Sequence, residues 1–149
     1  MSRFNREAMF SSAKGTWETP DDLYHVLDTE FHFTLDTSSQ ENGFDAFKNP
    51  WTGRVYCNPP YGRDVYWWIR EGYLSIYGNF HTAETVVFLL PARTDTRWFH
   101  EFILGKAEIR FIKGRLRFKG AHASAPFPSM IVIFRLPQKD RETEQEGGG

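Results

Sequence analysis

The residues Asn58-Pro59-Pro60-Tyr61 have the groups needed to handle an amino group carried on a flat aromatic ring. Such an amine is a poor nucleophile because its lone pair is delocalised into the ring. The side-chain oxygen of Asn58 and the backbone carbonyl of Pro59 could each accept one N–H bond, which favours a pyramidal, more reactive nitrogen. The prolines stiffen the loop, and Tyr61 offers a ring face for a base swung out of a duplex. The other interpretation is an ordinary turn at the end of a strand.

Cys57, which precedes this tetrapeptide, raises a competing chemistry: a thiol nucleophile as in carbon-5 cytosine methylation. Adjacent residues of a strand point to opposite faces, so if Asn58 faces a site, Cys57 faces away from it. We therefore expect a buried, inert thiol. A single cysteine also excludes a disulfide scaffold and a cysteine-based zinc site, and the five histidines lack metal-ligand spacing.

Basic residues are concentrated between Arg93 and Lys119. This segment contains eight basic and three acidic residues, a local net charge of +5. A segment of this kind suits a polyanion, although a solvated surface would look the same. The whole chain has 149 residues and a net charge of -1. Its length predicts one domain over residues 1–137, and the acidic, glycine-ended residues 138–149 read as a disordered tail. The sequence has neither an apolar run of membrane-spanning length nor the apolar core of a signal peptide.

The hydrophobic pattern predicts alternating helices and strands that position these groups. We expect strands at 33–36, 54–58, 85–90, 108–112 and 130–136. Helices are expected at 20–27, at 64–78 with Asp64 as its cap, and from Thr94 or Asp95 onward. Residues 37–52 read as loop, and the basic stretch between Gly114 and Gly120 reads as a ribbon-like insertion.

This order predicts an α/β fold with a mostly parallel sheet and an antiparallel edge pair made by the last two strands. Ligands of such sheets bind beyond the carboxyl ends of the strands. Three polar clusters are expected at that rim: Asp36, the tetrapeptide that begins at Asn58, and residues 91–94.

The sequence resembles the phage-encoded DNA N-6-adenine methyltransferase family, in its small single-domain Dam-type form. The resemblance covers Trp17 to about Arg135 and rests on five blocks in order: Trp17-Glu18-Thr19-Pro20, Phe33-Thr34-Leu35-Asp36, Asn58-Pro59-Pro60-Tyr61-Gly62, residues 90–96 with Trp98-Phe99, and Gly114-Arg115-Leu116-Arg117-Phe118. It implies a Rossmann-like, S-adenosylmethionine-dependent methyltransferase sheet. The glycine-rich loop of larger members is absent, and only 21 residues separate Asp36 from Asn58, so we expect the sheet to be trimmed on that side.

The resemblance implies methyl transfer from S-adenosylmethionine to adenine N6 in DNA, by a phage or prophage enzyme acting in the bacterial cytoplasm. It assigns catalysis to Asn58, Pro59, Pro60 and Tyr61. The implied cofactor-binding residues are Trp17, Thr19, Pro20, Asp36 and Asp45. The implied contacts to double-stranded DNA with a flipped adenine come from Arg93, Thr94, Lys113, Arg115 and Arg117.

Other outcomes stay open at this point. The same tetrapeptide could methylate cytosine N4, RNA adenine or a protein glutamine amide, and the chain could be a non-catalytic DNA-binding relic of the fold. No membrane partner and no metal are expected, and the oligomeric state is open. Protection of viral DNA from host nucleases is the role that the resemblance suggests.

Overall fold

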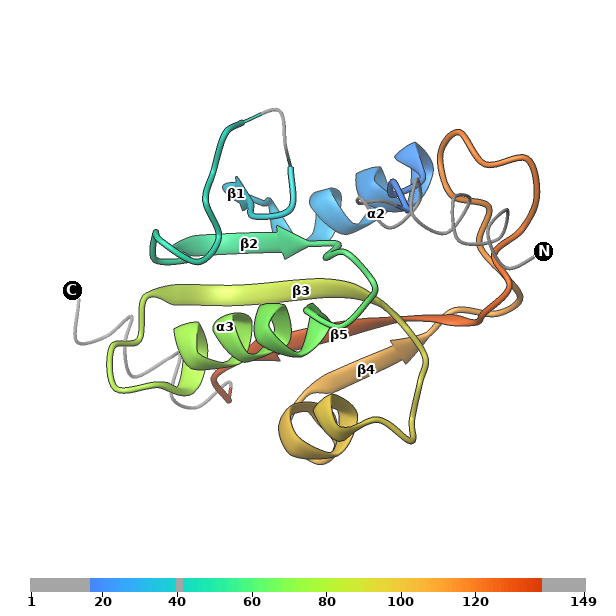
Figure 1. Cartoon of the computed structure of the whole chain (residues 1–149). Helices are drawn as coiled ribbons and strands as arrows, with labels where there is room; N and C mark the ends of the chain where they lie inside the picture. Colours follow the sequence, from blue (N-terminus) through green and yellow to red (C-terminus); the bar gives the residue numbers. More distant parts are fainter. Residues whose placement is uncertain (1–16, 40–41, 138–149) are drawn as a thin grey trace.

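Five strands form a single mixed sheet in the computed structural model, which describes residues 17–39 and 42–137 (Figure 1). The strands are β1 (Leu35–Asp36), β2 (Gly53–Cys57), β3 (Ala83–Pro91), β4 (Glu108–Phe111) and β5 (Ser129–Arg135). They lie in the order β1-β2-β3-β5-β4. β1, β2 and β3 are parallel, and β5 is antiparallel to both of its neighbours.

The α/β class and the antiparallel pair of last strands are confirmed, but the sheet is less parallel than expected. Parallel pairing is limited to β1, β2 and β3, because the last strand lies between β3 and β4. β5 suits this inner place because its residues from Ser129 to Phe134 are all buried. A strand that follows its neighbour without an intervening helix pairs with it antiparallel.

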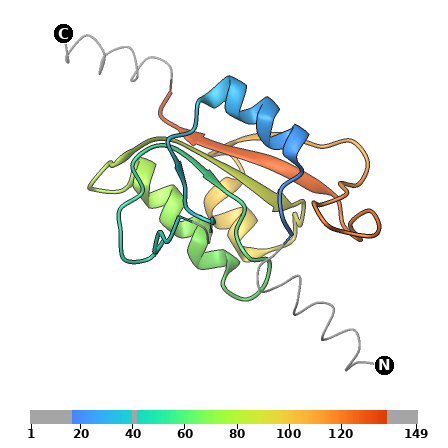
Figure 2. The same cartoon turned by 90° about the horizontal axis from the view of Figure 1, so that it is seen from above.

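Helices cover both faces of the sheet (Figure 2). The helix α2 (Asp21–Phe31) lies on one face, and α3 (Val65–Tyr77) with the short π-helix η1 (Phe99–Ile103) lies on the other. The core side chains divide in the same way. Tyr56, Val87 and Leu89 pack on the α2 side. The alternate residues of the same two strands pack on the α3 side. They are Val55 and Cys57 of β2 and Val86, Phe88 and Leu90 of β3.

Two predicted helix starts need correction. Asp64 precedes α3, but its side chain caps none of the described backbone N–H groups. At the start of η1 the cap position is Trp98, which gives no side-chain cap, and the side chain that reaches the first N–H is Thr96 rather than Thr94 or Asp95: the Thr96 hydroxyl accepts the N–H of Phe99 at 3.3 Å. In both segments the tertiary path of the preceding loop decides which side chain reaches the first turn, and local residue type does not reveal that path.

The prediction that the basic stretch between Gly114 and Gly120 is ribbon-like is also wrong. Residues 112–128 contain no strand in the structure and instead form an irregular loop. The loop is closed on itself by the Ala125 N–H, which donates to the Leu116 carbonyl at 2.7 Å. It is held from outside by the Lys119 N–H, which donates to the Glu18 carbonyl at 2.9 Å. Phe118 is buried under the loop and supplies its apolar anchor.

Cys57 is buried on the α3 side, as expected, and burial raises the pKa of its thiol well above the ordinary value. Within the described residues there is no cluster of His, Cys, Asp and Glu suited to a metal ion. The same residues include no helix that is long and apolar enough to span a bilayer. The predicted disordered tail, 138–149, lies outside the described residues.

Candidate active site

Asn58 follows the last residue of β2 and has a side chain that is half satisfied. Its Nδ2 donates to the backbone carbonyl of Trp17 and to the Thr19 hydroxyl, the latter at 3.2 Å. Its Oδ1 is buried and has no hydrogen-bond partner among the described residues. A carbonyl oxygen can only accept, so the nitrogen of the amide must face Trp17 and the oxygen must face away. The Asn58 Oδ1 is therefore a buried acceptor that receives no hydrogen bond from the described residues.

The backbone of Asn58 is linked to Asp36 through Ser38. The Ser38 hydroxyl accepts the Asn58 N–H at 3.0 Å and donates to Asp36 Oδ1 at 2.6 Å. The Ser38 N–H donates to the same carboxylate oxygen at 2.9 Å. Burial raises the pKa of Asp36, and the Ser38 hydrogen bonds oppose that rise because they favour the carboxylate. The structure thus joins two of the predicted site residues by one side chain.

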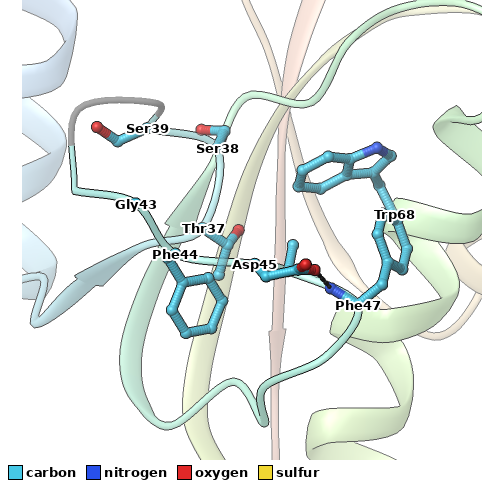
Figure 3. Close-up of a pocket in the computed structure, with 9 residues that line it drawn as sticks. Thr37, Ser38, Ser39, Gly43, Phe44, Asp45, Phe47 and Trp68 are labelled. Atoms are coloured by element: carbon cyan, nitrogen blue, oxygen red, sulfur yellow. Dashed lines mark hydrogen bonds between the residues drawn. The ribbon is translucent and has the colours of Figure 1, made fainter.

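A cavity of about 390 Å³ opens beside this link (Figure 3). It is lined by the turn that follows β1, by the next part of the loop and by one side chain of α3, namely Thr37, Ser38, Ser39, Gly43, Phe44, Asp45, Ala46, Phe47 and Trp68. Figure 3 shows the Asp45 carboxylate on the side of Trp68, where it accepts the Phe47 N–H at 3.1 Å. The cavity size lies within the range of small-molecule pockets. Its aromatic side chains and one carboxylate suit a planar ring with hydroxyl or amino groups.

Tyr61 is less open than the sequence suggested. It is 9% exposed, its hydroxyl donates to the Leu89 carbonyl at 2.9 Å, and burial raises its pKa. Its ring meets Phe118 and Phe127 edge-on, with centroids 6.5 and 5.7 Å away. Stacking of a base on Tyr61 therefore stays a prediction, and it requires the base to enter this aromatic cluster.

The predicted cofactor residues fall into separate places. Asp45 lines the cavity, and Asp36 lies behind Ser38. Trp17 and Thr19 are not cavity residues but contact Asn58, and the Trp17 indole packs against both Phe118 and Phe127 with centroids 5.3 Å from each.

Pro20 precedes α2, and its carbonyl accepts the Tyr24 N–H at 3.0 Å in the first turn of that helix. The structure therefore gives Pro20 a local role at the start of α2. A contact of Pro20 with the cofactor stays a prediction.

The basic segment divides into paired and unpaired residues. Several of its cations are engaged with acidic side chains or carbonyls: Arg97 with Glu101, Lys106 with the Glu101 carbonyl, Arg110 with Glu30 and Glu108, and Lys119 with Asp21. Lys113 and Arg115 are exposed and form no ion pair with any described residue. The free charge is thus concentrated in the 112–128 loop.

The other predicted DNA contacts lie at the same rim. Arg93 and Thr94 follow β3 and are exposed, and the Arg93 guanidinium lies 5.7 Å from the centre of the Phe127 ring. Arg117 is exposed, and its Nε donates to the Ala121 carbonyl at 3.2 Å. The Ala92 N–H donates to the Pro128 carbonyl at 2.9 Å, which ties the end of β3 to the 112–128 loop.

Sequence reasoning missed Ser38, Phe118 and Phe127 as parts of the site. Ser38 had a local signal, because an Asp followed two residues later by Ser commonly forms a turn through the Asp side chain. Phe118 was noted as part of a motif, but its burial against Trp17 joins residues about one hundred positions apart. Phe127 lies in an irregular loop with no periodic pattern.

Comparison with known proteins shows the family of the chain. A family model described as DNA N-6-adenine-methyltransferase (Dam) matches residues 7–144. A protein of Haemophilus phage HP1 (strain HP1c1) named DNA N-6-adenine-methyltransferase is 32% identical over 143 residues, covering 83% of this chain and 80% of its own length. No solved structure matches. The chain belongs to the Dam family of DNA N-6-adenine-methyltransferases.

Proposed function

We propose that this chain methylates adenine N6 in double-stranded DNA at the carboxyl ends of β2 and β3, on a methyltransferase-type α/β sheet. Membership of the Dam family supports DNA adenine as the acceptor, over cytosine N4, RNA adenine or a protein amide. The observation that carries the assignment of the site is the buried, unpartnered Oδ1 of Asn58. Such an acceptor costs a folded protein about 1–3 kcal/mol, so a ligand that donates to it is the expected explanation.

The roles of the tetrapeptide follow from its donors and acceptors. Asn58 Oδ1 accepts one N–H of the adenine amine, and the Pro59 carbonyl accepts the other. Because an amine with both hydrogens held by acceptors directs its lone pair outward, the nitrogen is oriented for attack. Pro60 stiffens the loop, and Tyr61 provides the stacking ring inside its aromatic cluster. Entry of the base requires side chains around Asn58 to move, because Oδ1 has almost no exposed surface.

The cavity beside Ser38 fits S-adenosylmethionine, which when bound supplies an electrophilic methyl group on a sulfonium. Phe44, Phe47 and Trp68 provide surfaces for the adenine ring of the cofactor, and the Asp45 carboxylate can accept from its ribose hydroxyls. The Thr37 hydroxyl, also in the cavity wall, is buried beside the Cys57 thiol. Asp36 and Ser38 hold the wall between this cavity and Asn58.

The test is incubation of the protein with radiolabelled S-adenosylmethionine and unmethylated duplex DNA, followed by digestion and identification of the labelled nucleoside. We expect N6-methyladenine. Labelled cytosine, or label only in RNA, would show that the acceptor is not adenine in DNA. Folded protein that binds the cofactor by calorimetry and yet labels no nucleic acid would refute the proposal and indicate a binding relic.

A further inference from the structure

The Asn58 amide is held from its nitrogen side by a segment that precedes α2. Trp17 contributes a backbone carbonyl, and Thr19 contributes a hydroxyl. An Asn side chain turned by half a circle about its last bond would place Nδ2 where Oδ1 now lies. It would then point two N–H donors at a substrate amine that itself brings only N–H donors to this contact. The two orientations of Asn58 therefore differ in their ability to bind the substrate.

Thr19 is itself fixed to the sheet. Its hydroxyl forms a 2.6 Å hydrogen bond with the hydroxyl of Tyr56, and Tyr56 is 1% exposed in the core on the α2 side. Tyr56 lies on β2, two residues before Asn58, which follows the strand, and the Thr19 hydroxyl contacts both side chains. Two hydrogen bonds therefore run from Tyr56 on β2 through Thr19 to the Asn58 nitrogen, directly after the same strand. Thr19 is thus held at a fixed place relative to Asn58.

The other half of the segment is fixed by the 112–128 loop. The Trp17 indole packs against both Phe118 and Phe127, and the Glu18 carbonyl accepts the Lys119 N–H at 2.9 Å. These contacts hold the Trp17 carbonyl over the Asn58 nitrogen. The segment is therefore supported at both ends, by β2 through Thr19 and by the loop through Trp17 and Glu18.

We propose that Thr19 is a positioning residue that, with the Trp17 carbonyl, fixes Asn58 with its oxygen toward the substrate amine. This inference rests on the proposed function, because it assumes that Asn58 Oδ1 accepts the adenine amine. It differs from the cofactor contact that the family resemblance implies for Thr19. A cofactor ligand changes the affinity for S-adenosylmethionine, whereas a positioning residue changes kcat.

The experiment compares Thr19→Val, which keeps the shape and removes the hydroxyl, with Thr19→Ser, which keeps the hydroxyl. Thr29→Val is the matched control, because Thr29 is an exposed α2 residue whose hydroxyl donates to the local His25 carbonyl. We expect Thr19→Val to lower kcat about 10- to 100-fold while the cofactor dissociation constant stays within about twofold. Thr19→Ser should recover most of the activity, and Thr29→Val should match the parent. An unchanged kcat in folded Thr19→Val, or a loss confined to cofactor affinity, would overturn the inference.

A second measurement does not depend on activity. In nuclear magnetic resonance spectra of the full chain, the Asn58 side-chain NH2 should exchange slowly with solvent in the parent and markedly faster in Thr19→Val. If the parent labels no DNA but shows this difference, the proposed function fails while the positioning stands. If exchange is equal in both proteins, the positioning role of Thr19 is refuted.

Should Thr19→Val not fold, the second variant is Tyr56→Phe, which removes the hydrogen bond that anchors Thr19. We expect it to speed Asn58 NH2 exchange and to lower kcat. No change in either quantity would contradict the proposal.

Discussion

The two ends of the Asn58 amide have different surroundings. Its nitrogen side takes part in the fold through Trp17 and Thr19, and its buried oxygen has no partner among the described residues. Under the proposed function, the substrate amine donates to the oxygen and so satisfies the second end.

Replacement of Asn58 by Ala should abolish methylation with little loss of stability. The variant loses the Nδ2 hydrogen bonds but also removes a buried oxygen without a partner, so the two effects on the free energy of unfolding partly cancel and leave about 1 kcal/mol or less. Turnover should fall by more than about 100-fold because the amine loses its acceptor. Methylation assays, cofactor calorimetry and thermal melting measure the three quantities. Asn79→Ala, in the exposed turn after α3, is the control, and retained turnover in Asn58→Ala would contradict the proposed role.

Ser38 and Asp36 give a prediction about pH. Burial raises the Asp36 pKa above its ordinary value of 3.8, so the folded chain binds this proton more tightly than the unfolded chain. The contribution of Asp36 to stability is therefore most favourable below about pH 3.8 and declines as pH rises through the raised pKa. The effect on cofactor binding has the opposite sense, because the Asp36 carboxylate accepts two hydrogen bonds from Ser38, which lines the cavity: cofactor affinity should fall as pH drops through that pKa.

Ser38→Ala removes the hydroxyl that favours the Asp36 carboxylate, so the Asp36 pKa should rise further. The acid limb of cofactor binding should then move to higher pH, measured as dissociation constants by calorimetry from pH 4 to 8. The neighbouring Tyr24 and Tyr56 have raised pKa values and stay neutral over this range. Ser39→Ala is the control, because only the backbone of Ser39 contacts Asp36. An acid limb that stays in place in Ser38→Ala would show that Asp36 does not govern cofactor binding.

At the scale of elements, the position of α3 against the sheet depends on a close approach at Gly72. A Cβ placed on Gly72 would lie 2.5 Å from the ring of Phe88 on β3 and 3.2 Å from Trp51. Both rings are fully buried, and neither can move without displacing the core. The absence of a side chain at Gly72 thus sets the distance between α3 and the strand that ends at the site.

Gly72→Ala should lower the free energy of unfolding by about 1–3 kcal/mol, even though Ala favours a helix by about 1 kcal/mol over Gly. Denaturant titration of the purified variant measures this change. Arg70→Ala, on the exposed face of the same helix, should change stability by no more than about 0.5 kcal/mol. Equal or greater stability in Gly72→Ala would show that the core adjusts at this contact.

The regular elements could be predicted from the sequence, but the contacts that complete the site could not. The apolar run of β3 and the periodic residues of α3 carry strong local signals, and both elements were placed to within two residues. Asn58 was singled out by the chemistry of its tetrapeptide, and Asp36 by its place at the end of a predicted strand. By contrast, the Ser38–Asn58 bond spans 20 residues, and the contacts of Asn58 with Trp17 and Thr19 span about 40. Such pairings depend on the tertiary path of irregular segments, which residue type alone does not specify.

At the scale of the whole molecule, charge is distributed so that the rim around Asn58 keeps its cations free. The acidic partners of the basic segment lie on α2, η1 and β4, where they neutralise Arg97, Arg110 and Lys119. Lys113 and Arg115 are left exposed on the loop that contacts Trp17. We therefore expect a polyanion to be attracted to the edge of the sheet at which the unpartnered Asn58 oxygen lies, although the net charge of the chain is only -1.

Neutralising this rim should weaken DNA binding without affecting the cofactor. In Arg115→Gln/Arg117→Gln we expect the slope of log affinity against log salt to decrease in magnitude by about 2, since each lost phosphate contact removes about 0.9. Arg54→Gln/Lys106→Gln is the matched control: it removes the same charge, but Arg54 lies near the amino end of β2 and Lys106 precedes β4, at the opposite edge of the sheet.

Fluorescence anisotropy with a labelled duplex at several salt concentrations gives both slopes, and calorimetry gives the cofactor affinity. If the two double variants lose DNA affinity equally, the attraction reflects total charge and not a defined face. If only the control loses affinity, the DNA lies across the amino ends of the strands, away from Asn58, and base entry at the tetrapeptide would be geometrically impossible.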